Sequence, residues 1–173
     1  MIEFIGKKWV SYAFKNNKRK HVFHNLQTMK SVLILFHFKD WMQIQLVAKD
    51  LERLGKKVFL WTVESTEESE VAIRIPLVMR VLTKEDFSKV NIIKSKTEKE
   101  FKNLKYDTLI DFCKDDGEGI DCLKYLLAIN NAEFCIGNRS NKEAYDLTVI
   151  QEENKGVLET FGQMKMYLNN IIP

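Results

Sequence analysis

A cluster of carboxylates stands out among the residues that could do chemistry. Asp111 lies within an apolar run, and four further acids follow closely at Asp115, Asp116, Glu118 and Asp121. Hard divalent cations such as Mg²⁺ prefer several oxygen ligands, so this segment could hold one. Acids also stabilise the start of a helix, because its N-terminus is its positive end. We favour the helix-capping interpretation, and we expect neither a metal site nor a bound cofactor.

Polar residues that follow predicted strands are the candidates for a small-molecule site. They are Asp40, the neighbouring Asp115 and Asp116, and Arg139. In open α/β sheets, ligands bind in the crevice beyond the carboxyl ends of the strands. Arg139 could hold a carboxylate or a phosphate through two parallel hydrogen bonds, although such an arginine more often makes a surface ion pair. Both uses stay open at this point.

The chain lacks the motifs of common catalytic and nucleotide-binding sites. The acidic segment contains Gly117 and Gly119, but Cys122 replaces the third glycine of a dinucleotide fingerprint. There is no Walker-type phosphate loop, and no Gly-x-Ser-x-Gly nucleophile elbow. His21 and His24 have the spacing of neighbours on a helix, yet no further ligand at a recognisable spacing completes a metal site. The sequence favours a protein without catalytic activity over an enzyme, and it offers no catalytic residue.

The first 30 residues form a basic arm. They contain seven basic residues and one acid, a local balance of +6, whereas the other residues have a balance of −3. Aromatic residues alternate with the cations, so one segment offers both phosphate neutralisation and flat surfaces on which bases can stack. The residues that we expect to contact nucleic acid are Lys15, Lys18, Arg19 and Lys20 for phosphates, with Trp9 and Tyr12 for bases.

Other uses of the arm are open. A basic amphipathic helix lying on an anionic membrane surface needs the same residue types. The purely structural alternative is a helix that leaves its lysines in water and docks on the domain through Ile2, Ile5, Trp9 and Tyr12. Among partners, we favour RNA or a ribonucleoprotein over a membrane surface.

Composition places the chain among ordinary globular domains. Its 173 residues are 45% hydrophobic and 29% charged, which suits a single domain and excludes a disordered chain. The longest apolar run, residues 32–38, is too short to cross a bilayer. Lys7 and Lys8 interrupt the apolar start, unlike a signal peptide, and three cysteines are an odd number for a disulfide framework. We therefore expect a cytoplasmic protein without a transmembrane segment.

Hydrophobic periodicity predicts strands that alternate with helices. We expect buried strands at residues 31–38, 57–63, 108–113 and 133–136 and a last short one at 146–150, with helices at 41–54, 97–105, 119–131 and 155–172. Asp40 and Gln43 have the spacing of a capping box, and Gly55 is typical of a helix end. Residues 64–89 contain Pro76, which favours an edge strand or an irregular connection, and a further short strand is expected at 89–93.

This alternation predicts an open, mostly parallel, doubly wound α/β sheet of the Rossmann type. The predicted organisation is a helical basic arm at residues 1–30 and one α/β domain at residues 31–173. Strand connections that return in parallel should be right-handed.

Several stretches resemble known families. The order YDTLIDF (106–112), KYLLAINNAEFCIGNRSNKEAYDLTV (124–149) and a closing helix ending in YLNNI is similar to a family of small α/β proteins from Bacteroidota that has no assigned activity. This resemblance covers nearly the whole chain and implies a bacterial, cytoplasmic setting. More distantly, part of the chain resembles the first domain of heptosyltransferase-type glycosyltransferases. That likeness implies a reduced domain that binds a sugar nucleotide or a carbohydrate near Asp40, Asp115 and Arg139, although those enzymes hold the sugar nucleotide mainly in a second domain.

Overall fold

A parallel six-stranded sheet forms the centre of the molecule. The computed structural model describes residues 2–64, 79–89, 92–114, 120–138, 144–149 and 156–172. Within these ranges the strands are β1 (Ser31–Leu35), β2 (Lys57–Val63), β3 (Met79–Leu82), β4 (Thr108–Asp111), β5 (Phe134–Gly137) and β6 (Leu147–Thr148). Every neighbouring pair is parallel, and the order across the sheet is β3-β2-β1-β4-β5-β6. The direction of winding reverses between β1 and β4, as in doubly wound α/β proteins, which confirms the predicted fold class.

The central strand β1 explains why the strands read as continuous apolar runs. Val32 and Ile34 pack into the core on one face of the sheet, whereas Leu33 and Leu35 pack into the core on the other face. Both faces are covered, so neither set of alternating side chains can be polar. The register places Leu33 beside Leu109 of β4.

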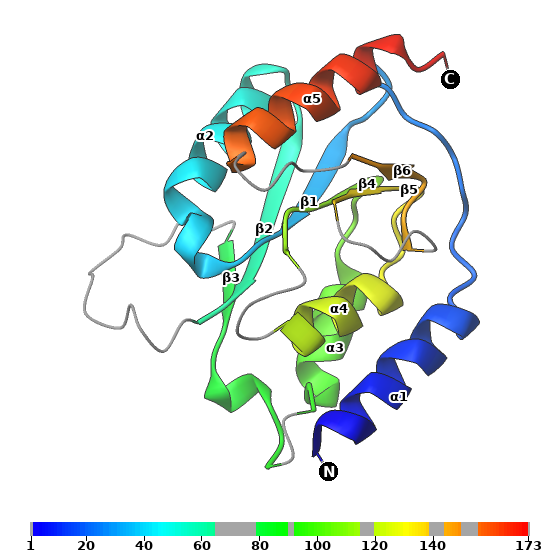
Figure 1. Ribbon diagram of the computed structural model, residues 1–173, viewed down its shortest axis with the longest axis vertical. Helices are drawn as coiled ribbons and strands as arrows, with labels where there is room; N and C mark the ends of the chain where they lie inside the picture. The colour runs from blue at the N-terminus through cyan, green and yellow to red at the C-terminus, as the bar shows by residue number, and fades with distance from the viewer. Residues whose placement is uncertain are drawn as a thin grey trace.

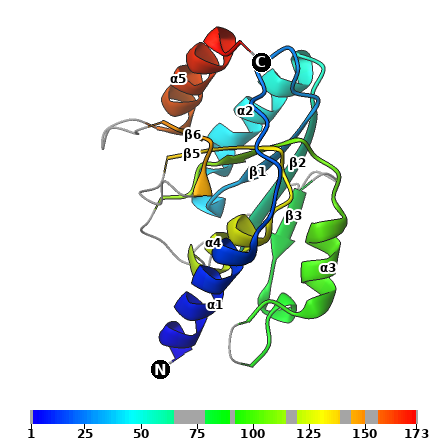
Figure 2. The same cartoon turned by 90° about the vertical axis from the view of Figure 1, so that its right-hand side faces the viewer.

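Helices cover both faces of the sheet (Figures 1 and 2). One layer consists of α2 (Trp41–Arg53) and α5 (Val157–Asn170), and the opposite layer consists of α3 (Ser95–Asn103) and α4 (Ile120–Ile129). The arm helix α1 (Ile2–Asn16) packs on α4, outside the second layer (Figure 1). Short 3₁₀ turns occur at Phe38–Asp40 and Lys84–Asp86.

The start of α2 differs from the predicted capping box. Asp40 precedes the helix but makes no side-chain cap hydrogen bond. A 3₁₀ turn ends at Asp40, and within it the N–H of Trp41 already donates to the carbonyl of Phe38. The side chain of Gln43 instead accepts a hydrogen bond from the backbone N–H of Leu158, at the start of α5, at 3.3 Å. The predicted end of α2 is confirmed, because Gly55 follows it with a φ of 76°, where a side chain would be strained.

The positions and bounds of some strands differ modestly from the predictions. The strand β3 lies at an edge, as predicted for the region that contains Pro76, although Pro76 itself lies outside the described residues. The short strand predicted at residues 89–93 is wrong in its described part, where a single antiparallel bridge joins Phe87 to Ile93. Strand β1 ends at Leu35, three residues earlier than the apolar run does.

Candidate functional site

The arm helix α1 is held against the end of α4. The side-chain amide of Asn17 donates to the carbonyls of Ala128 and Asn130, at 2.8 and 2.9 Å. Carbonyls in the last turn of a helix have no partner within the helix, so Asn17 satisfies groups that α4 leaves open. Phe14 packs against the core of the α3–α4 layer. The helix therefore docks on the domain, as in the structural alternative, but the docking contacts come from Phe14 and Asn17, and the predicted docking of Trp9 and Tyr12 is wrong.

Trp9 and Tyr12 nevertheless remain largely exposed on the docked helix, at 53% and 68%. They are three residues apart and so lie on the same side of α1. Both line a groove of about 340 Å³ between α1 and α4. Docking thus leaves the two aromatic residues accessible, as the nucleic-acid hypothesis requires.

Two lysines, Lys18 and Lys102, line this groove. Lys15 and Lys20 are exposed as well and lie close to Lys18 in the sequence. On its far side, Lys102 pairs with Glu98 at 2.6 Å. The rim therefore combines cations with accessible rings.

Tyr125 of α4 adds a third ring to the groove. Its hydroxyl donates to Glu98 at 3.1 Å. Burial, together with the neighbouring Glu98, raises the pKa of Tyr125 to about 12. The phenol is therefore a neutral donor at physiological pH, and its ring contributes no negative charge to the groove.

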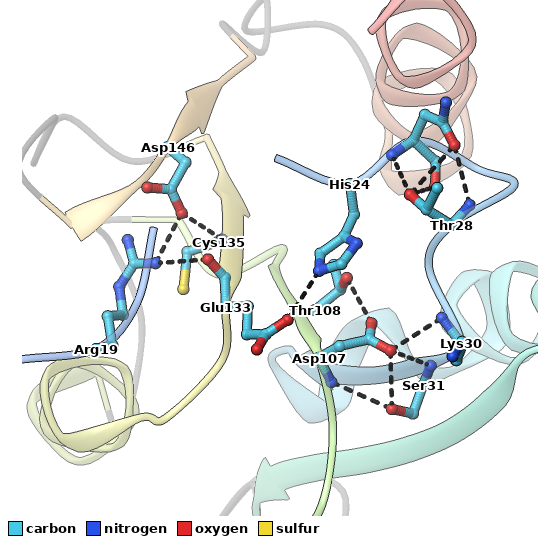
Figure 3. A network of polar contacts seen from close by, with 11 residues as sticks. Arg19, His24, Thr28, Lys30, Ser31, Asp107, Thr108, Glu133, Cys135 and Asp146 are labelled. Atoms are coloured by element: carbon cyan, nitrogen blue, oxygen red, sulfur yellow. Dashed lines mark hydrogen bonds and ion pairs between the residues drawn. The ribbon is translucent and has the colours of Figure 1, made fainter. Parts of the chain in front are cut away.

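Arg19 points away from this surface and into the protein (Figure 3). Its Nη1 lies 2.7 Å from Oδ2 of Asp146, and the exposed fractions of the two side chains are only 5% and 6%. The same carboxylate oxygen accepts the backbone N–H of Cys135 at 2.7 Å. Burial by itself would raise the pKa of Asp146, but hydrogen bonds from Arg19, His21 and Cys135 hold it below its ordinary value. Arg19 therefore fixes the arm to the sheet, whereas the lysines next to it face water.

The rest of the arm follows the amino-terminal edge of the sheet. His21 Nδ1 lies 2.6 Å from Asp146, and His24 Nε2 lies 3.2 Å from Glu133. Asn25 then donates to the carbonyl of Ile171, after α5, at 3.2 Å. The arm thus passes from the α4 side of the sheet to the α5 side before it enters β1. The two histidines that the sequence placed beside the basic cluster each pair with an acid.

Of the remaining candidate residues, Asp40 is the one that lies within the described ranges, at the carboxyl edge of the sheet. Asp40 follows β1 at the point where the winding reverses, and burial raises its pKa, opposed by Lys39, His37 and Lys114. His37 Nε2 lies 3.5 Å from the carbonyl of Lys114, so the segments after β1 and β4 meet here. Asp115, Asp116 and Arg139 lie outside the described residues.

Asp111 has a structural partner. It is fully buried, and its carboxylate accepts the hydroxyl of Tyr145 at 2.7 Å and the N–H of Cys113 at 2.9 Å. Sequence reasoning missed Tyr145, which gave no signal beyond a lone aromatic residue. Within the described ranges, no group of three or more histidine, cysteine, aspartate or glutamate side chains is placed to hold a metal ion.

The protein is a Rossmann-like α/β protein, as the order of its strands and the helices on both faces of the sheet show. Its N-terminal helix packs on the outside of one helical layer. The chain belongs to a family of unknown function, DUF6913, whose model matches residues 3–171. Neither curated proteins nor solved structures gave a match. The predicted resemblance to a family without assigned activity is thus confirmed at that level, whereas the Bacteroidota origin and the glycosyltransferase likeness stay predictions. None of the described helices has both the length and the apolar character that a bilayer span requires.

Proposed function

We propose that the protein is a non-catalytic binding protein that contacts single-stranded RNA, alone or within a ribonucleoprotein, through the α1–α4 groove. The main observation in support is that Trp9 and Tyr12 stay 53% and 68% exposed on a helix that is otherwise docked. Large aromatic side chains gain free energy when they are buried, so two accessible rings at a groove favour a binding role. Stacking on a base would cover them.

The exposed lysines that follow the two rings in the sequence support a nucleic-acid partner. Lys15, Lys18 and Lys20 are exposed within one short segment that follows the aromatic pair. A polynucleotide backbone carries one charge per nucleotide, so a row of lysines can follow it while bases enter the groove. A groove of about 340 Å³ is near the lower limit for small-ligand sites, which suits one or two bases. Bases must be unpaired to stack there, so we infer a single strand.

A membrane surface is the less favoured partner. A helix that lies in a membrane interface needs a free apolar face. In α1 the inward-facing Phe14 packs against the core of the domain, and the exposed rings line a groove.

A cytoplasmic setting is part of the proposal. It is supported by the free thiols of all three cysteines, Cys113, Cys122 and Cys135, as expected in a reducing compartment.

Replacing the two exposed rings tests the proposal. We expect Trp9→Ala and Tyr12→Ala each to raise the Kd for a fluorescein-labelled 12-nucleotide single-stranded RNA at least about fivefold, since stacking contributes about 1 kcal/mol or more per base. Tyr167→Ala is the matched control, because Tyr167 is an exposed aromatic residue on α5, on the opposite side of the sheet. Equal Kd values in all three variants would contradict the proposal.

A second candidate function is the binding of a sugar nucleotide or a carbohydrate at the carboxyl edge. The observation that favours it is the reversal of winding between β1 and β4, where Asp40 and Lys114 come near each other. A ligand present at a hundred times its Kd should stabilise the protein by about 2.7 kcal/mol. A thermal-shift panel of sugar nucleotides with Mg²⁺ tests this candidate, and an unchanged melting temperature for every member excludes it.

A further inference from the structure

The helices α2 and α5 pack side by side and form one outer layer of the molecule (Figures 1 and 2). Two contacts fix how they lie. Gln43 accepts the backbone N–H of Leu158 at 3.3 Å, and Asp50 pairs with Lys165 at 2.6 Å. Each contact lies seven positions after the other on both helices, so α2 and α5 run in the same direction. The arm helix α1 packs on the opposite layer, so this seam does not depend on the proposed function.

Apolar side chains gather on the solvent side of this seam. Met42 and Leu46 of α2 are 69% and 49% exposed, and Leu158 and Met166 of α5 are 41% and 54% exposed. Leu46 lies between the two positions of α2 that contact α5, so it borders the neighbouring helix. Leucine and methionine side chains that share one surface in this way are typical of an interaction site.

Gly162 lies at the centre of a ridge on α5. Leu158, Gly162 and Met166 follow one another at intervals of four residues, which places them in one row along the helix. A Cβ added to Gly162 would meet no atom within 4 Å, so the glycine faces open space. Glycine destabilises the interior of a helix relative to alanine. At this point, however, it allows the backbone of another helix to approach closely.

The exposed face of α5 offers no free charge to a partner. Its two charged residues are Glu159 and Lys165, and both are engaged within the chain. Glu159 accepts the N–H of Gly156 at 2.6 Å, and Lys165 is paired with Asp50. Nucleic acids and anionic membranes bind through free cations, which this face lacks. Its electrostatic complement is therefore another uncharged, apolar surface.

We propose that this seam is the contact between two copies of the chain, related by a twofold axis. A twofold contact requires a pattern that is complementary to itself. The ridge meets this requirement, because Leu158 lies four residues before Gly162 and Met166 lies four residues after it. Two such ridges pack antiparallel at a crossing angle of about −50°. The glycines then meet, and Leu158 of each copy contacts Met166 of the other.

The α2 side extends this contact and sets its expected strength. Met42 and Leu46 lie toward the start of α2, whereas its exposed Arg53 lies at the end. The antiparallel arrangement keeps the two Arg53 side chains at opposite ends of the contact. A layer of two helices, each about 20 Å long and about 10 Å wide, presents a face of roughly 400 Å². A contact of that size is at the weak end of specific interfaces, so we expect a Kd in the micromolar range.

Sedimentation velocity of the full chain over a concentration series tests the dimer. We expect a reversible monomer–dimer equilibrium for the wild type. Leu158→Glu and Met166→Lys should each stay monomeric, because each places unpaired charges in the contact. Their circular dichroism should not change, since both side chains are exposed. The matched control is Tyr167→Lys, which alters an exposed residue turned about 100° from Met166 on the same helix and should leave the equilibrium intact.

Gly162→Gln separates an interface role from a structural one. Glutamine favours a helix more than glycine does, so the melting temperature of the monomer, measured at low concentration, should not fall. The Kd of the dimer should nevertheless rise at least tenfold, because the new side chain keeps the two backbones apart. An unchanged Kd would contradict the crossing at Gly162.

Mixing Leu158→Glu with Met166→Lys tests the register of the contact. In the mixed dimer the introduced carboxylate faces the introduced ammonium, and the other contact remains that between Leu158 and Met166. We expect the mixture to dimerise although each variant alone is monomeric. A wild type that stays monomeric at every concentration overturns the proposal, as does a dimer that survives in either variant or a mixture that stays monomeric.

Discussion

Arg19 and Asp146 form a buried ion pair, 2.7 Å between Nη1 and Oδ2, that joins the arm to the segment before β6 across 127 positions of sequence. Arg19 also donates to the carbonyl of Glu133, at 3.4 Å. Removing one partner of such a pair leaves an uncompensated buried charge, which is costly. The ion pair therefore holds the arm in place as part of the folded domain.

Replacing Arg19 should destabilise the whole protein. We expect Arg19→Met to lower the free energy of unfolding by about 3 kcal/mol, because Asp146 then stays buried without its cation. Urea denaturation followed by circular dichroism measures this change. The neighbouring Lys18→Ala serves as control and should change stability by less than about 0.5 kcal/mol, since Lys18 is exposed. A loss below about 1 kcal/mol for Arg19→Met would mean that the arm is not fixed through this pair.

The same carboxylate should make stability depend on acidity. The pKa of Asp146 is lower in the folded protein than its ordinary value of 3.8, so folding favours the charged form. Its stabilisation is therefore fully present above the ordinary aspartate range and is lost as the pH falls through the lowered folded pKa. The stability difference between the wild type and Asp146→Asn, measured by urea denaturation, should shrink as the pH falls below about 4. A difference that grows as the pH falls below about 4 would contradict this assignment.

Gly137 lies so close to the ring of Tyr145 that a larger residue at position 137 and the tyrosine ring should not both fit. A Cβ added to Gly137 would collide with ring carbons of Tyr145, whose hydroxyl is held by Asp111. We expect Gly137→Ala to cost about 1 to 3 kcal/mol, because the ring has to move. In Tyr145→Ala the same glycine substitution should cost clearly less, which a double-mutant cycle measures. Purely additive effects would show that the ring does not oppose a side chain at residue 137.

Much of the fold could be predicted, because strands that are buried on both faces of a sheet appear in the sequence as continuous apolar runs. The run that follows Ser31 and contains the rest of β1 is apolar except for His37, and β2 has the predicted bounds, Lys57–Val63. The first turn of α2 was mispredicted for a long-range reason. Gln43 has the right spacing for a capping box, but Leu158 of α5 competes for its side chain.

The candidate site was harder to predict, because the charge of a residue does not indicate whether its side chain faces water or the interior of the protein. Arg19 lies between Lys18 and Lys20 in sequence, and nothing local indicates that it faces Asp146 instead of water. What the local pattern did predict was the combination of exposed lysines and aromatic residues in the arm, although the exposure of Trp9 and Tyr12 could be known only from the structure.

The salt dependence of RNA binding tests the central claim most directly. If Lys15, Lys18 and Lys20 each contact one phosphate, a plot of log affinity for a single-stranded RNA against log salt should have a slope of about −2, at roughly 0.7 per contact. Lys15→Ala/Lys18→Ala/Lys20→Ala should bring that slope close to zero while circular dichroism stays unchanged. The matched variant Lys49→Ala/Lys84→Ala/Lys89→Ala, which removes three exposed lysines elsewhere, should keep the slope of the wild type. Equal slopes in the two variants, or no binding of RNA even at low salt, would contradict the claim that this arm is a nucleic-acid interface.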